Sequence, residues 1–192
     1  MNNSIKAYAF WDASHNLRTG TKIIVNDDET VIGNVVMKNP GSSCPLEYTS
    51  SREDGRLRFT VDATMYAIVD LFDIKEKGGT INIYNLSDER NPDYNKAKNS
   101  LTSSDYNVLD ELKTLNVPTY IGWGEMWRDE RFTYKANLIF ELVKEQTKGY
   151  GWHIGDTIYF HPLYLMRYGL NRNDCREVLN RFRSNFIKNE NN

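Results

Sequence analysis

The sequence is poor in the residues that build metal sites and disulfide frameworks. It contains two cysteines, Cys44 and Cys175, and three histidines, His15, His153 and His161. None of them stands at the short spacings that are typical of zinc or iron–sulfur ligands. We therefore expect no metal and no cofactor, and we expect both thiols to be reduced.

Long apolar runs and an excess of charge of one sign are also missing. No apolar stretch approaches the roughly 18 residues that span a bilayer, and the N-terminus lacks the basic and apolar regions of a signal peptide. We expect a soluble, cytoplasmic protein without a membrane partner. The formal net charge of −2 means that any surface for nucleic acid would be local and not spread over the whole chain.

The chain has 192 residues, of which 40% are hydrophobic, and this is enough for one domain with a substantial core. We expect a single α/β domain over residues 1–192. Residues 1–29 would form an N-terminal extension or edge strands, with Ile5–Trp11 and Lys22–Val25 as the candidate strands or hairpin. Residues 30–165 would form a motif-bearing core, and residues 166–192 a C-terminal helix.

Four apolar runs are expected to be core strands. The first, Val31–Met37, is β-branched and almost continuously apolar, which is typical of a strand buried on both faces of a parallel sheet. The other three runs are Thr80–Leu86, Val117–Gly122 and Thr157–Phe160. The polar stretch Cys44–Arg58 has neither helical nor strand periodicity and is expected to be a long surface loop.

Between these strands, apolar residues at spacings of three and four predict amphipathic helices. The first helix begins at Asp62 and is expected to end near Gly78 and Gly79. The other three begin at the candidate N-cap Ser104, or cover residues 129–148 and 174–188. The alternation of strands and helices predicts a three-layer α/β/α fold with a mainly parallel four-stranded central sheet.

Each predicted strand ends on a small polar signature. The C-terminal ends of parallel strands meet at one edge of a sheet, so Asn39, Asn85 and His161 are expected to line one cleft. Taken singly, an Asn at a strand end is more often a turn former, and a His is more often a structural group. The four signatures are Asn39-Pro40-Gly41, Tyr84-Asn85-Leu86, Gly122-Trp123-Gly124 and His161-Pro162-Leu163.

The order of these motifs resembles that of the uracil-DNA glycosylase superfamily. Its members place an Asn-Pro or Asp-Pro turn after the first core strand, an Asn after the second, a Trp-Gly pair after the third and a His-Pro or Asn-Pro turn after the fourth. Over residues 31–165 the chain more closely resembles a bacterial and phage family of unknown function. That family has Asn-Pro-Ser, Asp-x-Thr, Asn-Leu, Trp-Gly and His-Pro-Leu-Tyr-Leu elements, and Asp62-Ala63-Thr64 would be its second element here.

The glycosylase resemblance implies a hydrolase that removes a uracil, mismatched or modified base flipped out of DNA. His161 would hydrogen-bond the base oxygen where negative charge grows, and Asn39 would hold the attacking water, so these two would be catalytic. Asn85 would read the amide edge of the base, because a carboxamide offers a donor beside an acceptor. The remaining substrate-binding residues implied are Pro40, Gly41, Ser42 and Trp123.

The segment after His161 carries an apolar cluster, Leu163–Met166, and is followed by several cations. In the glycosylases this segment enters the duplex, so the resemblance implies that Tyr164, Arg167 and Arg172 contact DNA. The other interpretation is a core-facing loop and a helix with solvated cations.

Two further functions stay open at this point. One is a non-catalytic protein of the same fold that binds a nucleotide or nucleic acid, because related folds do not guarantee related chemistry. The other is an interaction protein, such as a phage factor that captures a host component.

Overall fold

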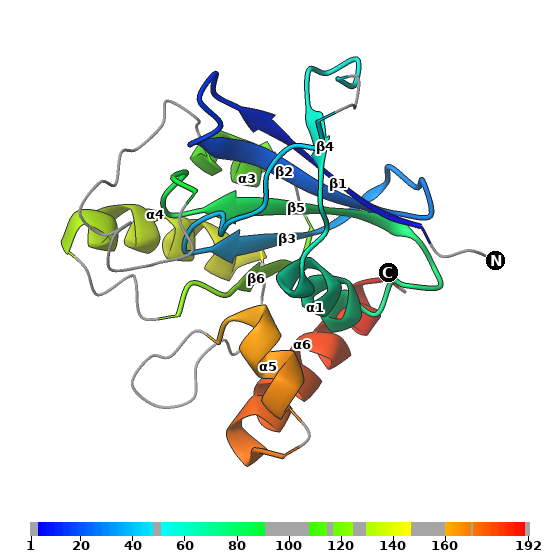
Figure 1. Ribbon diagram of the computed structural model, residues 1–192. Helices are drawn as coiled ribbons and strands as arrows, with labels where there is room; N and C mark the ends of the chain where they lie inside the picture. Colours follow the sequence, from blue (N-terminus) through cyan, green and yellow to red (C-terminus); the bar gives the residue numbers. More distant parts are fainter. Residues whose placement is uncertain are drawn as a thin grey trace.

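The computed structural model describes residues 4–47, 51–90, 108–114, 117–124, 130–146, 160–169 and 171–190. Within these residues the chain forms one six-stranded mixed sheet and five helices (Figure 1). The strands are β1 (Ile5–Trp11), β2 (Arg18–Val25), β3 (Val31–Met37), β4 (Leu57–Phe59), β5 (Gly79–Asn85) and β6 (Thr119–Ile121). The helices are α1 (Ala63–Phe72), α3 (Val108–Thr114), α4 (Glu130–Gln146), α5 (Pro162–Tyr168) and α6 (Asn173–Glu190).

The sheet has the strand order β4-β1-β2-β5-β3-β6. Strand β3 pairs in parallel with both β5 and β6, whereas the pairs β1–β2, β1–β4 and β2–β5 are antiparallel. The α/β class is confirmed, but the prediction of a mainly parallel, four-stranded sheet is wrong. The reason is that the β1–β2 hairpin joins the main sheet through β2 and β5, and this adds an antiparallel half.

Three of the four predicted core strands are present in the structure. The runs at Val31, Thr80 and Val117 correspond to β3, β5 and β6. Residues 157–159 of the predicted fourth strand lie outside the described residues, and Phe160 has no regular secondary structure. The expected surface loop Cys44–Arg58 runs into a short edge strand, β4, where Phe59 forms a bridge with Pro45.

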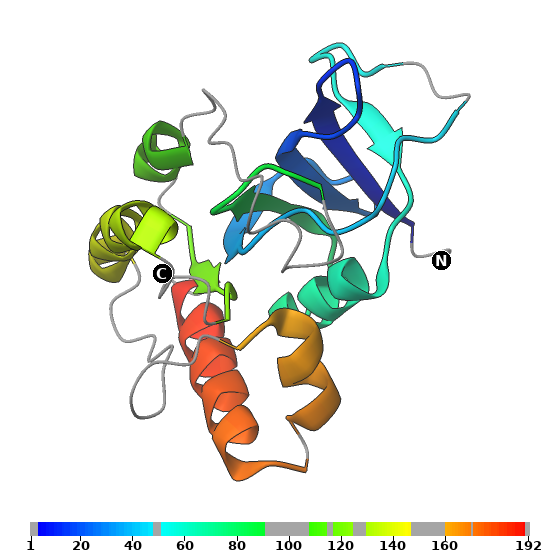
Figure 2. The ribbon, with the colours of Figure 1, turned by 60° about the vertical axis from the view of Figure 1, so that its left-hand side comes forward.

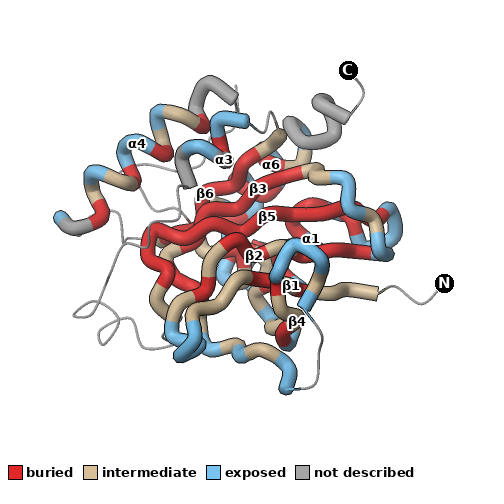
Figure 3. The backbone as a smooth tube through the Cα atoms, turned by 90° about the horizontal axis from the view of Figure 1, so that it is seen from above, coloured by how far each residue is buried: buried red, intermediate tan, exposed pale blue. Residues whose placement is uncertain are grey.

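A polar ladder crosses the buried centre of the parallel strands. The Asn82 side chain on β5 donates to Asn34 Oδ1 on β3 at 3.2 Å, and Asn34 Nδ2 donates to Thr119 Oγ1 on β6 at 3.3 Å. All three residues are buried, and so is most of the length of the strands that carry them (Figure 3). Each hydrogen bond joins residues that are partners in the strand register, so the ladder stabilises that register.

The helices form two groups (Figure 2). Helices α1, α5 and α6 pack against one another, and α3 packs against α4. The predicted stripe of α6 is confirmed for its four described side chains, since Cys175, Val178, Leu179 and Phe182 are all buried. The ring of Phe182 meets Tyr120 of β6 at a centroid distance of 5.3 Å, so α6 covers this edge of the sheet.

Helix α1 is shorter than its sequence pattern predicts. Asp62 is its N-cap and accepts a hydrogen bond from Met65 N at 3.0 Å. The helix ends at Phe72 because Asp73 adopts the left-handed conformation, with φ of 55°, and its N–H bonds back to the last turn. The predicted end at Gly78 and Gly79 is therefore wrong, because Gly78 follows the turn after α1 and Gly79 is the first residue of β5.

The predicted N-cap Ser104 lies outside the described residues, and the helix it was expected to begin is described from Val108. No helix in the described part of the chain combines the length and the apolar character needed to cross a bilayer.

Candidate functional site

The C-terminal ends of β3 and β5 lie side by side. Met37 and Asn85 are register partners in the parallel pair, and Ser87 N donates to Lys38 O at 3.0 Å just beyond the strands. Asn39 and Asn85 therefore leave the sheet at neighbouring points. The N-termini of α1 and α5 approach the same edge, which is where open α/β sheets bind ligands.

A cavity of about 100 Å³ opens at this edge. It has space for several water molecules or a small planar group. Its polar lining is formed by Arg18, Lys38, Asn39, Asp62, Thr64, Asn85 and His161, and its other lining residues are Met37, Pro40, Gly41, Met65, Ile68 and Ile83. The three residues expected to share a cleft, Asn39, Asn85 and His161, all line this cavity.

His161 is held as the N-cap of α5. Its Nδ1 accepts a hydrogen bond from Leu163 N at 3.3 Å, and Pro162 occupies the first turn, as is common at helix starts. Burial, with a smaller contribution from Lys38, lowers the pKa of His161 to about 4. The imidazole is therefore neutral at pH 7, and because Nδ1 is the acceptor, the proton is assigned to Nε2. His161 can donate a hydrogen bond there without carrying a charge.

Asn85 presents an acceptor without a partner. Its side chain is only 3% exposed, and Oδ1 is buried with no hydrogen-bond partner among the described residues. An unpaired buried acceptor of this kind costs about 1–3 kcal/mol. Such groups are rare in folded proteins unless a water or a ligand completes them. Asn39 is also buried, at 9% exposed, and lies on the β3 side of the cavity.

Asp62 joins two parts of the cavity wall. Its Oδ1 accepts from Met65 N, and its Oδ2 accepts from Ser43 Oγ at 3.2 Å. The carboxylate thus ties the start of α1 to the turn after β3. The sequence marked Asp62-Ala63-Thr64 as a motif element without a chemical role, and the structure places both Asp62 and Thr64 in the cavity lining.

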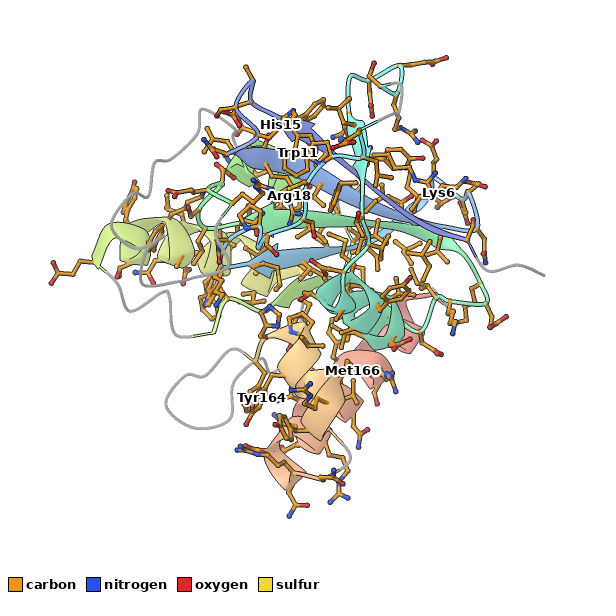
Figure 4. All side chains as sticks on the ribbon, viewed as in Figure 1. Lys6, Trp11, His15, Arg18, Tyr164 and Met166 are labelled. Carbon is orange, nitrogen blue, oxygen red and sulfur yellow. The ribbon has the colours of Figure 1, made fainter. Side chains whose placement is uncertain are left out.

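Arg18 is the lining residue that sequence reasoning missed. It begins β2, is only 4% exposed, and donates from Nη2 to Pro40 O at 3.1 Å. Its guanidinium lies 4.7 Å from the ring centroid of Phe59 and 5.8 Å from that of Trp11. Figure 4 shows Arg18 and Trp11 close together at the end of the hairpin. The sequence offered no signal, because Arg18 stands in a polar stretch between two short apolar runs.

Of the remaining predicted substrate-binding residues, two line the cavity and two do not. Pro40 and Gly41 line the cavity, whereas Ser42 is exposed in the turn and its carbonyl accepts from Arg90 Nη1 at 3.2 Å. Trp123 is only 2% exposed and does not line the cavity.

The residues predicted to contact nucleic acid lie on a separate, exposed surface. Tyr164 is 36% exposed and stacks on Phe160 with an interplanar angle of 9°. Arg172 donates from Nη1 to the Tyr164 hydroxyl at 2.5 Å, and Arg167 is exposed at the end of α5. None of these side chains lines the cavity, although α5 begins at its edge.

No family model, no curated protein and no solved structure matches the chain. The described residues contain no group of three His, Cys, Asp or Glu side chains placed to hold a metal ion.

Proposed function

We propose that the protein is a DNA glycosylase-like hydrolase that cleaves the N-glycosidic bond of a uracil, mismatched or modified base. The observation that carries the proposal is the unpaired Oδ1 of Asn85 in the same small cavity as the neutral His161. An acceptor and a neutral donor at one sheet edge suit the amide edge of a nucleobase. The proposal also takes the two helix groups as the outer layers of a glycosylase-like α/β/α domain.

The departing base accumulates negative charge as the glycosidic bond breaks. The Nε2–H of His161 would donate to the base oxygen where this charge grows. A neutral imidazole suits this task because it strengthens its hydrogen bond in the transition state without first giving up a proton. The low pKa of His161 therefore supports stabilisation of the anion and argues against full protonation of the base.

The sugar accumulates positive charge in the same step. Asp62 supplies a carboxylate to the cavity, and Asn39 offers a side-chain amide that would hold the attacking water. Asn39 cannot accept a proton at neutral pH, so its role would be to position the water. Asp62 would stabilise the positive charge electrostatically.

DNA is the proposed source of the base. The support is the exposed surface of α5, where Tyr164 offers an aromatic face and Arg167 offers positive charge. Arg172 follows α5 and is paired with Asp174, so a phosphate would compete with this carboxylate for it. Aromatic faces and cations together suit an unpaired strand or a distorted duplex.

One observation favours a second candidate, a binding protein of the same fold without hydrolysis. Both oxygens of Asp62 already accept hydrogen bonds, from Met65 N and Ser43 Oγ, so the carboxylate is poorly placed to take a proton from water. A cavity without a free general base can still bind a nucleotide or nucleic acid.

Release of free base from DNA decides between these functions. We would incubate the full chain with single-stranded and duplex DNA that contains uracil, mismatched or hypermodified bases, and score base release. His161→Ser is the variant of choice, because Ser retains the N-cap of α5 that Ala would remove but is too short to place a donor where the Nε2–H of His161 lies. The expected loss of rate is on the order of 100-fold.

The companion variants separate the proposed roles. Asn39→Ala is expected to slow base release, and Asn85→Ala is expected mainly to relax the choice of base. Base release that is unaffected by His161→Ser would refute the mechanism. No release by wild type from any substrate would favour the binding protein.

A further inference from the structure

Arg18 presents a buried positive charge with unused hydrogen-bond donors in the cavity wall. Only Nη2 has a protein acceptor, Pro40 O, while Nε and Nη1 are buried without a partner among the described residues. Buried arginines are normally paired with an acid or fully hydrogen-bonded. The arrangement at Arg18 therefore points to a missing anionic partner.

The protein around Arg18 does not supply that partner. The rings of Phe59 and Trp11 attract the charge, but an aromatic face is only a weak acceptor for an N–H edge. Asp62 is the nearest opposing charge, and its two oxygens are engaged by Met65 N and Ser43 Oγ. Burial lowers the pKa of Arg18 to about 10, so the guanidinium remains charged at pH 7.

The side chain is also held in place before any ligand arrives. Its backbone N donates to Asp88 O at 2.9 Å, and its guanidinium is fixed by Pro40 O and the two rings. A guanidinium fixed in this way loses little conformational freedom when it binds an oxyanion.

The charges near Arg18 favour an anion with more than one negative charge. Lys38 lines the same cavity, and Arg90 lies close enough to lower the pKa of Arg18. Arg18 and Lys38 thus line the cavity together with the carboxylate of Asp62, and Arg90 adds a third positive charge near Arg18. Phosphate suits such a cluster, because it offers several oxygens to the donors of arginine and a compact charge to lysine.

We propose that the cavity binds the phosphate group of its ligand, with Arg18 as the main contact and Lys38 as the second. The phosphate belongs either to a free nucleotide or to a nucleic-acid backbone. That the rest of the ligand is a nucleotide rests on the proposed function, whereas the phosphate site itself serves a binding protein equally well.

The test compares thymidine, which has no phosphate, with three probes that carry one or more phosphate groups. Inorganic phosphate, thymidine, thymidine 5′-monophosphate and a single-stranded oligothymidylate without terminal phosphates are titrated into the full chain by calorimetry. Wild type is expected to bind at least one phosphate-bearing probe about 10- to 100-fold more tightly than thymidine. Preference for the monophosphate would identify a free nucleotide, and preference for the oligonucleotide would identify a backbone phosphate.

Two substitutions at Arg18 and one control complete the test. Arg18→Met, which keeps the volume, is expected to abolish the preference, while Arg181→Met, an exposed arginine on α6 paired with Glu177, is expected to retain it. If Arg18→Met does not fold, Arg18→Lys decides, because it keeps the charge but loses the planar edge and should weaken the preference.

The proposal is overturned if wild type binds thymidine and every phosphate-bearing probe equally. It is also overturned if the Arg18→Met variant keeps the full preference for phosphate. Preference for phosphate without base release from any DNA would refute the hydrolase and leave the phosphate site standing. Base release without any preference for phosphate would support the hydrolase and refute the phosphate site.

Discussion

Lys135 on α4 is bonded to the backbone of Asn85 at the end of β5. Its Nζ donates to Asn85 O at 3.2 Å and to Leu86 O at 3.0 Å. Burial lowers the pKa of Lys135, while Asp88 opposes this effect. The lysine therefore connects a helix that does not line the cavity to the strand end that carries Asn85.

We expect Lys135→Met to lower the free energy of unfolding by about 1–3 kcal/mol, because two carbonyls lose a charged donor. The same change should speed amide exchange around Leu86 and weaken ligand binding through Asn85. Urea unfolding and hydrogen exchange measure these effects. Lys113→Met is the matched control, since Lys113 is exposed on α3 and, among the residues that the structure describes, pairs with Asp110 at 3.3 Å. Equal effects of both substitutions would contradict the role given to Lys135.

Two buried asparagines on β5 should respond in opposite ways to the same substitution. Asn82→Leu removes the donor to Asn34 Oδ1 and should cost about 1–3 kcal/mol of stability. Asn85→Leu removes an acceptor that has no partner among the described residues, so stability should stay the same or rise. Chemical denaturation of both variants gives the comparison. A large loss of stability in Asn85→Leu would show that Oδ1 is satisfied in solution.

The low pKa of His161 predicts that the protein loses stability in mild acid. The unfolded chain takes up this proton at about pH 6.5, whereas the folded protein takes it up only at about pH 4. Between these values the unfolded state binds more protons, so the free energy of unfolding falls as the pH falls, by about 1 kcal/mol per pH unit. His161→Asn should reduce this slope between pH 6.5 and 4. Equal slopes in wild type and His161→Asn would argue against a buried neutral imidazole.

Gly33 allows α1 to pack closely on β3. A Cβ at this position would lie 2.1 Å from the Phe72 ring, so Gly33→Ala should cost about 1–3 kcal/mol and displace the C-terminal end of α1. The double variant Gly33→Ala/Phe72→Leu should recover part of the lost stability, because leucine is smaller than the phenylalanine ring that the new Cβ would contact. Gly41→Ala meets no atom within 4 Å and should cost about 1–2 kcal/mol through its positive φ alone. Thermal unfolding would measure these variants together with Gly41→Ala/Phe72→Leu, in which the change at Phe72 should recover none of the stability lost at Gly41.

The sequence was informative where function depends on strand ends. The signatures at Asn39, Asn85 and His161 were expected to line one cleft, and all three line the same cavity. Their chemical roles stay predictions. Trp123 shows the limit of this reasoning, because a motif gives the position of a residue along the chain but not the direction of its side chain.

Arg18 could not be predicted because its position depends on long-range pairing. Strand β2 reaches the cavity only by pairing with β5, with Thr21 opposite Ile83. No local pattern around residue 18 encodes an antiparallel partner so distant in sequence. The same missing information explains why the sheet was expected to be mainly parallel, since periodicity identifies strands but not their neighbours.

The Asn34–Asn82–Thr119 ladder has a consequence for how the protein folds. Its members are far apart in the sequence, so three strands must come together over long sequence separations before the amides are hydrogen-bonded. A compact intermediate with a shifted strand would bury an amide without its partner, at a cost that disfavours that intermediate. The ladder therefore favours the native register of β3, β5 and β6, and this register sets the positions of the β3 and β5 ends at the cavity.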